Sequence, residues 1–411
     1  MRINLNAALY RKFCLIAAVA IFFTNFANYS EQWGFIPLYW IGILGALIAP
    51  LLVGSALTSS LPVRPLMIWC AGYLTISIFW YFLSRQDAVA YQEVQTRFLS
   101  VIFVLMMLFL CARPEEQRLA RAAIALAVLL AVGLNVYELF NPLTFSKIPG
   151  RSSGLFENAN QSGSALMLGM ILSYAVVPRP LRVPFIFVTG IGIFVTFTRS
   201  AMLGWIIIVL FLAVRGRFGM RQMRGVLVVS AVVLAFLYSP YWGELQTTLE
   251  ARGSLNLSVL QRITFFSTGS AGDDSASERR LVAEAAWRLF AQEPFTGYGT
   301  GYARNIEGFT VGTHNIYLAN MLDHGIIGLF IMPSLLLATL WGQTRKTFEV
   351  AVPFVVFMTM WGFFSHNVLE ERYILLAVAL VASLVASQRV LRAEAPAVER
   401  VLTPAGAVAS A

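Results

Sequence analysis

The chain has 411 residues, of which 58% are hydrophobic and only 12% are charged, and its formal net charge is +9. Soluble domains carry about 25% charged residues, so this composition excludes a water-soluble fold, and the apolar excess excludes an intrinsically disordered chain. Three scattered cysteines exclude a secreted disulfide scaffold. The composition therefore predicts an all-α polytopic membrane protein with one integral domain, residues 1–411. The basic balance is typical of membrane topology signals rather than of nucleic-acid binding.

A membrane-spanning helix needs about 20 mostly apolar residues, and twelve segments approach this length. They are 13–29, 36–58, 65–83, 98–112, 119–140, 160–177, 181–198, 200–214, 225–241, 322–341, 350–366 and 371–388. The first follows Arg11-Lys12 and has no small-residue cleavage site after it, so we expect a retained span rather than a signal peptide. The three cysteines all fall in apolar segments, where small core residues are expected.

The distribution of basic residues predicts the orientation of these spans. With the N-terminus in the cytoplasm, 18 of the 30 lysines and arginines lie on the cytoplasmic side. Half of the other 12 lie in one long loop, which crosses a membrane largely regardless of its charge. Both termini are therefore expected in the cytoplasm. The opposite, periplasmic face then carries several arginines that topology does not require.

The long external loop, residues 242–313, is the only stretch large enough to form structure outside the membrane. Ser275-Ala276-Ser277-Glu278 is a capping box, which predicts a helix that runs to about Gln292. The predicted apolar stripe of this helix comprises Leu281, Ala285 and Leu289 with Val282, Ala286 and Phe290. Arg279 and Arg280 fall in its first turn, where basic groups oppose the helix dipole. This indicates a bound anion nearby, unless the arginines form exposed pairs with Glu278 or Glu284.

Two further places on the external face carry arginine at membrane level. Arg199 lies in the tight Thr196–Ser200 link between two apolar segments, and Arg151 comes shortly before the polar run Glu157–Ser162. A charge in so short a link must face protein, water or a ligand. The structural alternatives are an arginine that snorkels to the interface and an amide-rich helix cap.

Histidine and carboxylate groups complete the external inventory. His314 lies beside Asn315 where the chain re-enters the membrane, and it is either a functional or a structural histidine. His366-Asn367 with Glu370-Glu371 forms a further cluster that we expect to be mostly structural. Asp273-Asp274 favours a solvated turn over a cation site, and the dispersed histidines and cysteines have no zinc-ligand spacing. No metal or cofactor is expected.

Several arginines, one histidine and no metal site together favour one kind of chemistry. The guanidinium fork matches diphosphate oxygens and is easier to desolvate than an ammonium group. A neutral histidine can take a proton from a sugar hydroxyl while arginines hold a leaving diphosphate. A lipid-linked diphosphate would reach such a site from within the bilayer.

Over about residues 154–330 the chain resembles the membrane family of O-antigen ligases and polymerases. The similar motifs are Gly154–Gln161, the Thr196–Ser200 link, Ser277-Glu278-Arg279 with Trp287, Glu293–Gly301, and His314-Asn315 followed nine residues later by Gly325-Ile326-Ile327-Gly328. Glu293 stands where the family usually has histidine. The spacing to Trp287 favours Arg279 over Arg280 as the family arginine.

The resemblance implies a periplasmic-face glycosyltransferase of the bacterial inner membrane. It would move O-antigen from undecaprenyl diphosphate to the lipid A–core oligosaccharide. The same resemblance implies that His314 is the base and that Arg279 and Arg199 hold the diphosphate. Further candidate substrate-binding residues are Arg280 and Arg151 for the diphosphate and, with weaker support, Asn158, Asn160, Asn315 and Tyr298.

Other activities remain open at this point. An O-antigen polymerase commonly has two large external loops, and a protein O-oligosaccharyltransferase tends to have a sizeable C-terminal extension. This chain shows one large loop and about 20 residues after its last predicted span, so ligase is the preferred activity. A transporter or flippase of lipid-linked sugars would need charges along a path across the bilayer. Glu138 and Asp323 are the few candidates, and both lie near the external ends of their spans.

Overall fold

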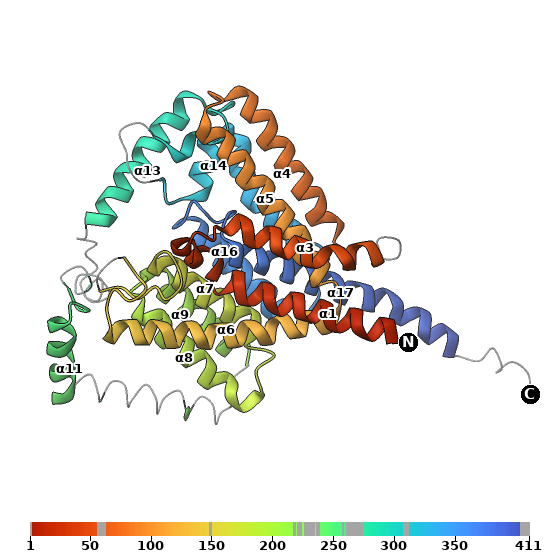
Figure 1. Cartoon of the computed structure of the whole chain (residues 1–411), viewed down its shortest axis with the longest axis horizontal. Coiled ribbons are helices and arrows are strands. Elements are labelled where there is room, and N and C mark those ends of the chain that lie inside the picture. Colours follow the sequence, from red (N-terminus) through yellow and green to blue (C-terminus); the bar gives the residue numbers. More distant parts are fainter. Residues whose placement is uncertain are drawn as a thin grey trace, which may run out of the picture.

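The computed structural model describes residues 2–402, apart from 56–62, 148–149, 217–218, 220–223, 226–234, 236–238, 257–258, 260–273 and 307–311. Within these residues every regular element is a helix (Figure 1). The elements are α1 (Arg2–Ala18), η1 (Val19–Phe23), α2 (Phe26–Tyr29), η2 (Ser30–Trp33), α3 (Pro37–Ser55), α4 (Arg64–Leu83), α5 (Ala88–Leu110), α6 (Pro114–Phe140), α7 (Ala159–Ser173), η3 (Arg179–Leu181), α8 (Arg182–Val195), α9 (Arg199–Val214), α11 (Pro240–Ala251), α13 (Asp274–Gln292), η4 (Tyr302–Arg304), α14 (Ile316–His324), η5 (Gly325–Phe330), α15 (Ile331–Leu340), α16 (Phe348–Gly362) and α17 (Arg372–Leu402).

Five of the described helical segments are long and apolar enough to cross a membrane. They are Arg64–Leu83, Ala88–Leu110, Pro114–Phe140, Ile316–Leu340 and Arg372–Arg389. Shorter apolar helices cover Pro37–Leu52, Arg199–Val214 and Phe348–Gly362. A helical membrane protein is thus confirmed. The count of twelve spans stays a prediction, and most of its segment 225–241 lies outside the described residues.

Two predicted spans differ from the helices observed. The segment 13–29 is interrupted, because the chain bends by 62° between Ala7–Phe23 and Phe26–Trp33, with Asn25 in a left-handed conformation (φ 63°). The segment predicted to begin at residue 98 begins ten residues earlier, as α5. Asp87 caps this helix by accepting a hydrogen bond from the amide of Ala90 (2.8 Å). Arg97 therefore lies inside a span rather than in an external loop.

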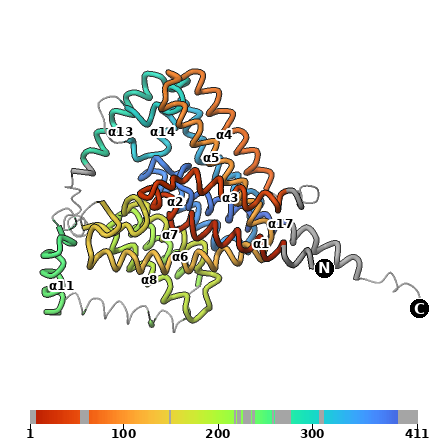
Figure 2. The backbone as a smooth tube through the Cα atoms, in the orientation of Figure 1, coloured from red at the N-terminus to blue at the C-terminus, as the bar shows by residue number. Residues whose placement is uncertain are grey.

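Helix α17 lies at the centre of the bundle. It contacts α5, α6, α7, α15 and α16, and nearly every residue from Tyr373 to Ser387 is buried. The tube in Figure 2 shows α4, α5 and α14 on one side of this centre and α6, α7 and α8 on the other. The three cysteines are buried free thiols within the same core, as the apolar context predicted.

The segment 242–313, which the sequence predicts to be external, carries helix α13, and the end of this helix at Gln292 is as predicted. It begins at Asp274, so Arg279 and Arg280 lie in the second turn rather than the first, where the helix dipole has less effect. The side chain of Ser275, the first residue of the capping box, lies outside the described residues.

Helix α13 docks on α14 through one face. The buried residues of that face are Val282, Ala286 and Phe290, which cluster with Leu318, Met321 and Leu322 of α14. Leu281 is exposed, so the predicted stripe was too wide. This packing fixes the arginines of α13 relative to the start of α14.

The glycines of the turn-rich run 293–301 allow two backbones to touch. Gly297 (φ +63°) lies so close to α14 that a Cβ there would be 2.6 Å from the amide nitrogen of Gly325 and 2.7 Å from the carbonyl oxygen of Leu322. Gly325 (φ +62°) in turn packs against Phe295. Both positions need a left-handed backbone and have no room for a side chain. The two glycine-containing motifs, Glu293–Gly301 and Gly325–Gly328, are thus in direct backbone contact.

We expect Gly297→Ala to destabilise the protein well beyond the cost of a left-handed alanine, because the methyl group meets backbone that cannot move aside. The measurement is the fraction of detergent-solubilised protein that survives heating. The control is Gly34→Ala, which has a similar positive φ (+84°) but no atom within 4 Å of the new Cβ. Equal losses in both variants would contradict the clash.

Candidate functional site

His314 and Asn315 form the entry to helix α14. The Asn315 side chain accepts hydrogen bonds from the amides of Tyr317 (3.0 Å) and Leu318 (3.1 Å), so it is the N-cap of this helix. His314 takes a left-handed backbone conformation (φ 50°), which is uncommon for a residue other than glycine. A strained backbone held by a cap is typical of a residue whose side chain must point in one direction.

The imidazole of His314 lies next to a second histidine. Its ring and that of His366 are 5.4 Å apart between centroids and meet edge to face. Gly312 makes room for this pair, since a Cβ there would lie 2.7 Å from the His366 ring. Burial, and next the positive charge of Arg279, lowers the pKa of His314 to about 4. His314 is therefore neutral at pH 7 and able to accept a proton.

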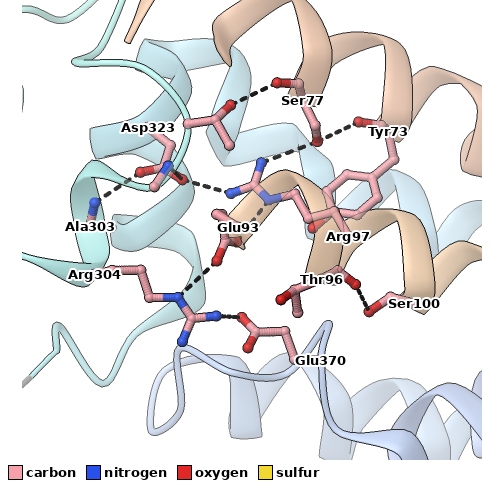
Figure 3. A network of polar contacts seen from close by, with 12 residues as sticks. Tyr73, Ser77, Glu93, Thr96, Arg97, Ser100, Ala303, Arg304, Asp323 and Glu370 are labelled. Atoms are coloured by element: carbon pink, nitrogen blue, oxygen red, sulfur yellow. Dashed lines mark hydrogen bonds and ion pairs between the residues drawn. The ribbon is translucent and has the colours of Figure 1, made fainter. Parts of the chain in front are cut away.

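His366 lines a small pocket together with members of a largely buried ionic network centred on α5, which Figure 3 shows. Arg97 bonds Glu93 (Nε–Oε1, 2.8 Å) and Asp323 of α14 (Nη2–Oδ2, 2.6 Å). Arg304 of η4 bonds the other oxygen of Glu93 (Nε–Oε2, 2.8 Å) and also pairs with Glu370. Each of these three carboxylates therefore has a guanidinium partner.

The network also anchors the turn that carries the glycines. Asp323 accepts hydrogen bonds from the amides of Gly301 (3.1 Å) and Ala303 (2.9 Å). Arg97 donates to Ser77 of α4 (3.2 Å), so α4, α5, α14 and the turn are held by one set of charges.

A second polar group surrounds Arg151. This buried guanidinium donates to Asn160 Oδ1 (2.8 Å), to the carbonyl oxygen of Thr196 (3.3 Å) and to the hydroxyl of Thr198 (3.2 Å). It therefore joins the start of α7 to the short link before Arg199, which is half-buried as the first residue of α9. Asn158 caps α7 by accepting from the amides of Asn160 and Gln161.

The turn between α16 and α17 connects these two polar groups. Glu370 pairs with Arg304 on the His314 side. Its neighbour Glu371 accepts a hydrogen bond from Gln161 Nε2 (2.6 Å) on the Arg151 side. Burial, and next the charges of Glu157 and Glu370, raises the pKa of Glu371 to about 8. Two adjacent glutamates thus link the ionic network around Arg97 to the polar group around Arg151.

The remaining candidate residues make contacts within the protein. Arg280 is exposed and pairs with Glu284 (2.8 Å). The Tyr298 hydroxyl donates to the carbonyl oxygen of Leu289 (3.0 Å), and its ring stacks on Tyr302 with 4.3 Å between centroids. Within the described residues, no three histidines, cysteines or carboxylates gather as a metal site. Asp273 and the side chain of Asp274 lie outside those residues.

The sequence drew little attention to the residues that the structure places around His366. His366 was expected to be mostly structural, and Glu93, Arg97 and Arg304 were not singled out. A usable signal was present, because Glu93 and Arg97 are oppositely charged residues four apart directly before a long apolar run.

Comparison with known proteins adds one finding. A family model described as O-antigen ligase matches residues 184–332. The matched part runs from α8 to the start of α15 and contains Arg199, Arg279, His314 and the two glycine motifs. It does not contain the Gly154–Gln161 run, Arg97 or His366. No curated protein matches the chain in a search.

Proposed function

We propose that the chain is a membrane glycosyltransferase of the O-antigen ligase family and that it uses a lipid-diphosphate-linked glycan as donor. The match of that family's model to residues 184–332 supports this proposal. The observation that carries the proposal is the neutral His314 at the start of α14, whose pKa the charge of Arg279 helps to lower. A neutral base beside a guanidinium fits a reaction that removes a proton at one point and stabilises an anion at another.

The proposed reaction is one displacement. His314 takes the proton of an acceptor hydroxyl, and the hydroxyl oxygen bonds to the anomeric carbon of the donor glycan. The bond between that carbon and the diphosphate oxygen breaks, and its electron pair leaves with the lipid diphosphate. Arg279 and Arg199 are proposed to hold this anion. Arg151 donates a hydrogen bond to Thr198, the residue before Arg199, and so supports the position of Arg199.

The proposed donor is an undecaprenyl-diphosphate-linked O-antigen, and the proposed acceptor is the lipid A–core oligosaccharide. The proposed location is the bacterial inner membrane, with twelve spans, cytoplasmic termini and the 242–313 loop in the periplasm. The positive-inside count supports this orientation. In Figure 1 the first turns of α1 and the last turns of α17 lie at the same end of the bundle.

The acceptor decides between ligase and polymerase. The test supplies purified protein with lipid-linked glycan and offers either lipid A–core or a second lipid-linked glycan as acceptor. Glycan on lipid A–core supports the ligase, and longer lipid-linked chains alone would show a polymerase. Transfer to neither acceptor, nor to a protein acceptor, by folded protein would contradict the proposed function.

A transporter has less support from the contacts of its two candidate carboxylates. Glu138 accepts hydrogen bonds from the amides of Phe145 (2.9 Å), Ser153 (2.7 Å) and Gly154 (3.1 Å), so it holds the loop after α6. Asp323 is held by Arg97 and the glycine turn. Both carboxylates hold loops in place.

Arg279→Gln should lower glycan transfer by about a hundredfold, the usual loss when one group that stabilises a leaving anion is removed. Arg280→Gln is the matched control, since Arg280 is the adjacent residue on the same helix and is exposed with its charge on Glu284. We expect that control to keep nearly normal activity. The measurement is the initial rate of glycan transfer at saturating acceptor. A larger loss in Arg280→Gln than in Arg279→Gln would reverse the two roles.

A further inference from the structure

A cavity lies at the opposite end of α16 from the His314–His366 pair. Its volume is about 190 Å³, and α6, α16 and α17 form its walls. Lys346 lines it just before α16, whereas His366 follows the other end of α16. A helix of 15 residues, about 22 Å long, separates the two. This cavity is therefore distinct from the proposed glycan site.

The polar lining of the cavity is basic. Arg121 of α6, Lys346 and Gln388 supply its long polar side chains, and none of the described residues that line it is an aspartate or a glutamate. The acidic residue Glu349, in the first turn of α16, accepts a hydrogen bond from the Tyr174 hydroxyl (3.0 Å). The cavity thus carries net positive charge.

Arg121 is incompletely satisfied by the protein. Its Nε donates to the carbonyl oxygen of Leu172 (2.5 Å), but its buried Nη2 has no hydrogen-bond partner among the residues that the structure describes. The nearby Arg182, by contrast, donates hydrogen bonds to the carbonyl oxygens of Ala175 (2.8 Å) and Val177 (3.0 Å). A buried guanidinium with an unused donor favours an anionic ligand.

The rest of the cavity is apolar, with a wall of Val350, Val381 and Val385. It lies between the start of α6, where Arg121 is in the second turn, and the end of Arg372–Arg389, two of the segments that are long and apolar enough to cross a membrane. Lys346 stands just before the shorter apolar helix α16. A basic pocket with an apolar wall between spanning helices has the character of a lipid headgroup site. A free inorganic anion would gain nothing from that wall.

We propose that this cavity binds an anionic phospholipid. Arg121 and Lys346 hold the headgroup phosphate, and an acyl chain lies along the apolar wall between α16 and α17. The proposal is independent of glycan transfer, because it concerns the opposite end of the bundle.

The test measures lipid bound to the full-length protein purified in detergent, by native mass spectrometry after addition of phosphatidylglycerol, phosphatidylcholine or inorganic phosphate. We expect retention of phosphatidylglycerol and little retention of phosphatidylcholine. Arg121→Gln and Lys346→Gln should each weaken binding of phosphatidylglycerol by about fivefold, the effect of one basic residue near an anionic headgroup.

The matched controls are Arg118→Gln on the same helix as Arg121 and Arg345→Gln beside Lys346, since both side chains are exposed and do not line the cavity. They should bind as the unaltered protein does. Lys346 is itself exposed, so Lys346→Gln reports on binding even where Arg121→Gln lowers the yield. Equal retention of both lipids, inorganic phosphate that competes as well as lipid, or unchanged binding in Lys346→Gln would each overturn the proposal.

Discussion

We expect His314→Asn to abolish measurable glycan transfer while the protein still inserts and folds. Removal of a general base costs about 10²–10⁴ in rate, and we expect a loss near the upper end because the asparagine amide cannot take the proton. Asparagine is the informative replacement, since it tolerates the left-handed backbone at this position (φ 50°) and cannot act as the base. The measurements are the transfer rate and the amount of monodisperse protein in detergent.

His366→Phe serves as the comparison for this variant. It keeps a ring against His314 and against the backbone at Gly312, so packing is retained and the neighbouring nitrogen atoms are removed. Substantial transfer by His366→Phe with none by His314→Asn assigns the base to His314. Normal transfer by His314→Asn would remove His314 from the reaction.

The pH dependence follows from the same two histidines. Both have a pKa lowered to about 4, against an ordinary value near 6.5. Transfer should therefore stay constant as the pH falls from 7 to about 5 and decline only near 4. The histidines affect stability differently, because below pH 6.5 the unfolded chain protonates two histidines that the folded protein keeps neutral. Glu371 acts in the opposite direction, since with a pKa of about 8 it is protonated in the folded protein but not in the unfolded chain above its ordinary value of 4.5. Two histidines outweigh one glutamate, so stability should decrease between pH 6.5 and 4, and a thermal scan across that window measures it.

Arg97→Met should be the most destabilising single change in the protein. It leaves the buried carboxylate of Asp323 without its guanidinium partner, whereas Glu93 keeps its pair with Arg304. Breaking a buried ion pair from one side costs about 3–5 kcal/mol, since an uncompensated charge stays buried. We expect a large fall in the temperature at which the detergent-solubilised protein aggregates. Arg97→Lys keeps the charge but loses the guanidinium fork, so its aggregation temperature should lie between those of the unaltered protein and Arg97→Met.

The double variant Arg97→Met with Asp323→Asn distinguishes lost charge balance from lost packing. If uncompensated charge is the cause, removing a carboxylate as well should recover part of the stability. Arg280→Gln provides the control, because the pair it breaks is exposed and its loss should leave the aggregation temperature unchanged. A double variant less stable than Arg97→Met alone would show that the carboxylate matters for another reason.

The sequence predicted the kind of fold better than its boundaries. Apolar length identified α4, α6 and α17 closely, because an uninterrupted apolar run has few alternatives in a membrane. It placed the start of α5 ten residues late, since Glu93 and Arg97 break the run and only their ionic partners from distant segments explain them. The bend at Asn25 was missed for a related reason, because a turn within an apolar segment leaves hydropathy unchanged.

The sequence likewise brought out some residues of the candidate site and not others. His314, Arg279 and Arg199 stood out because charge is scarce in this chain, and all three fall within the matched family region. Their roles remain proposals. His366 and Glu371 were predicted to be mostly structural, and their place near His314 was not foreseen. They lie more than 50 residues after His314, and only tertiary packing brings the turn between α16 and α17 beside it. Caps such as Asn158 and Asn315 look like binding residues in sequence because amides serve both purposes.

The ionic network also has a consequence for how the protein is made. Glu93 and Arg97 are four residues apart with the acid first, the favourable order for a pair within one helix, so α5 can enter the bilayer during synthesis as a neutral segment. Arg304, Asp323 and Glu370 are translated more than 200 residues later. The early pair makes insertion feasible, and the late partners lock the helices only when the chain is nearly complete. A nascent chain released before Glu370 would therefore reside in the membrane with its spans inserted but its glycan site unassembled.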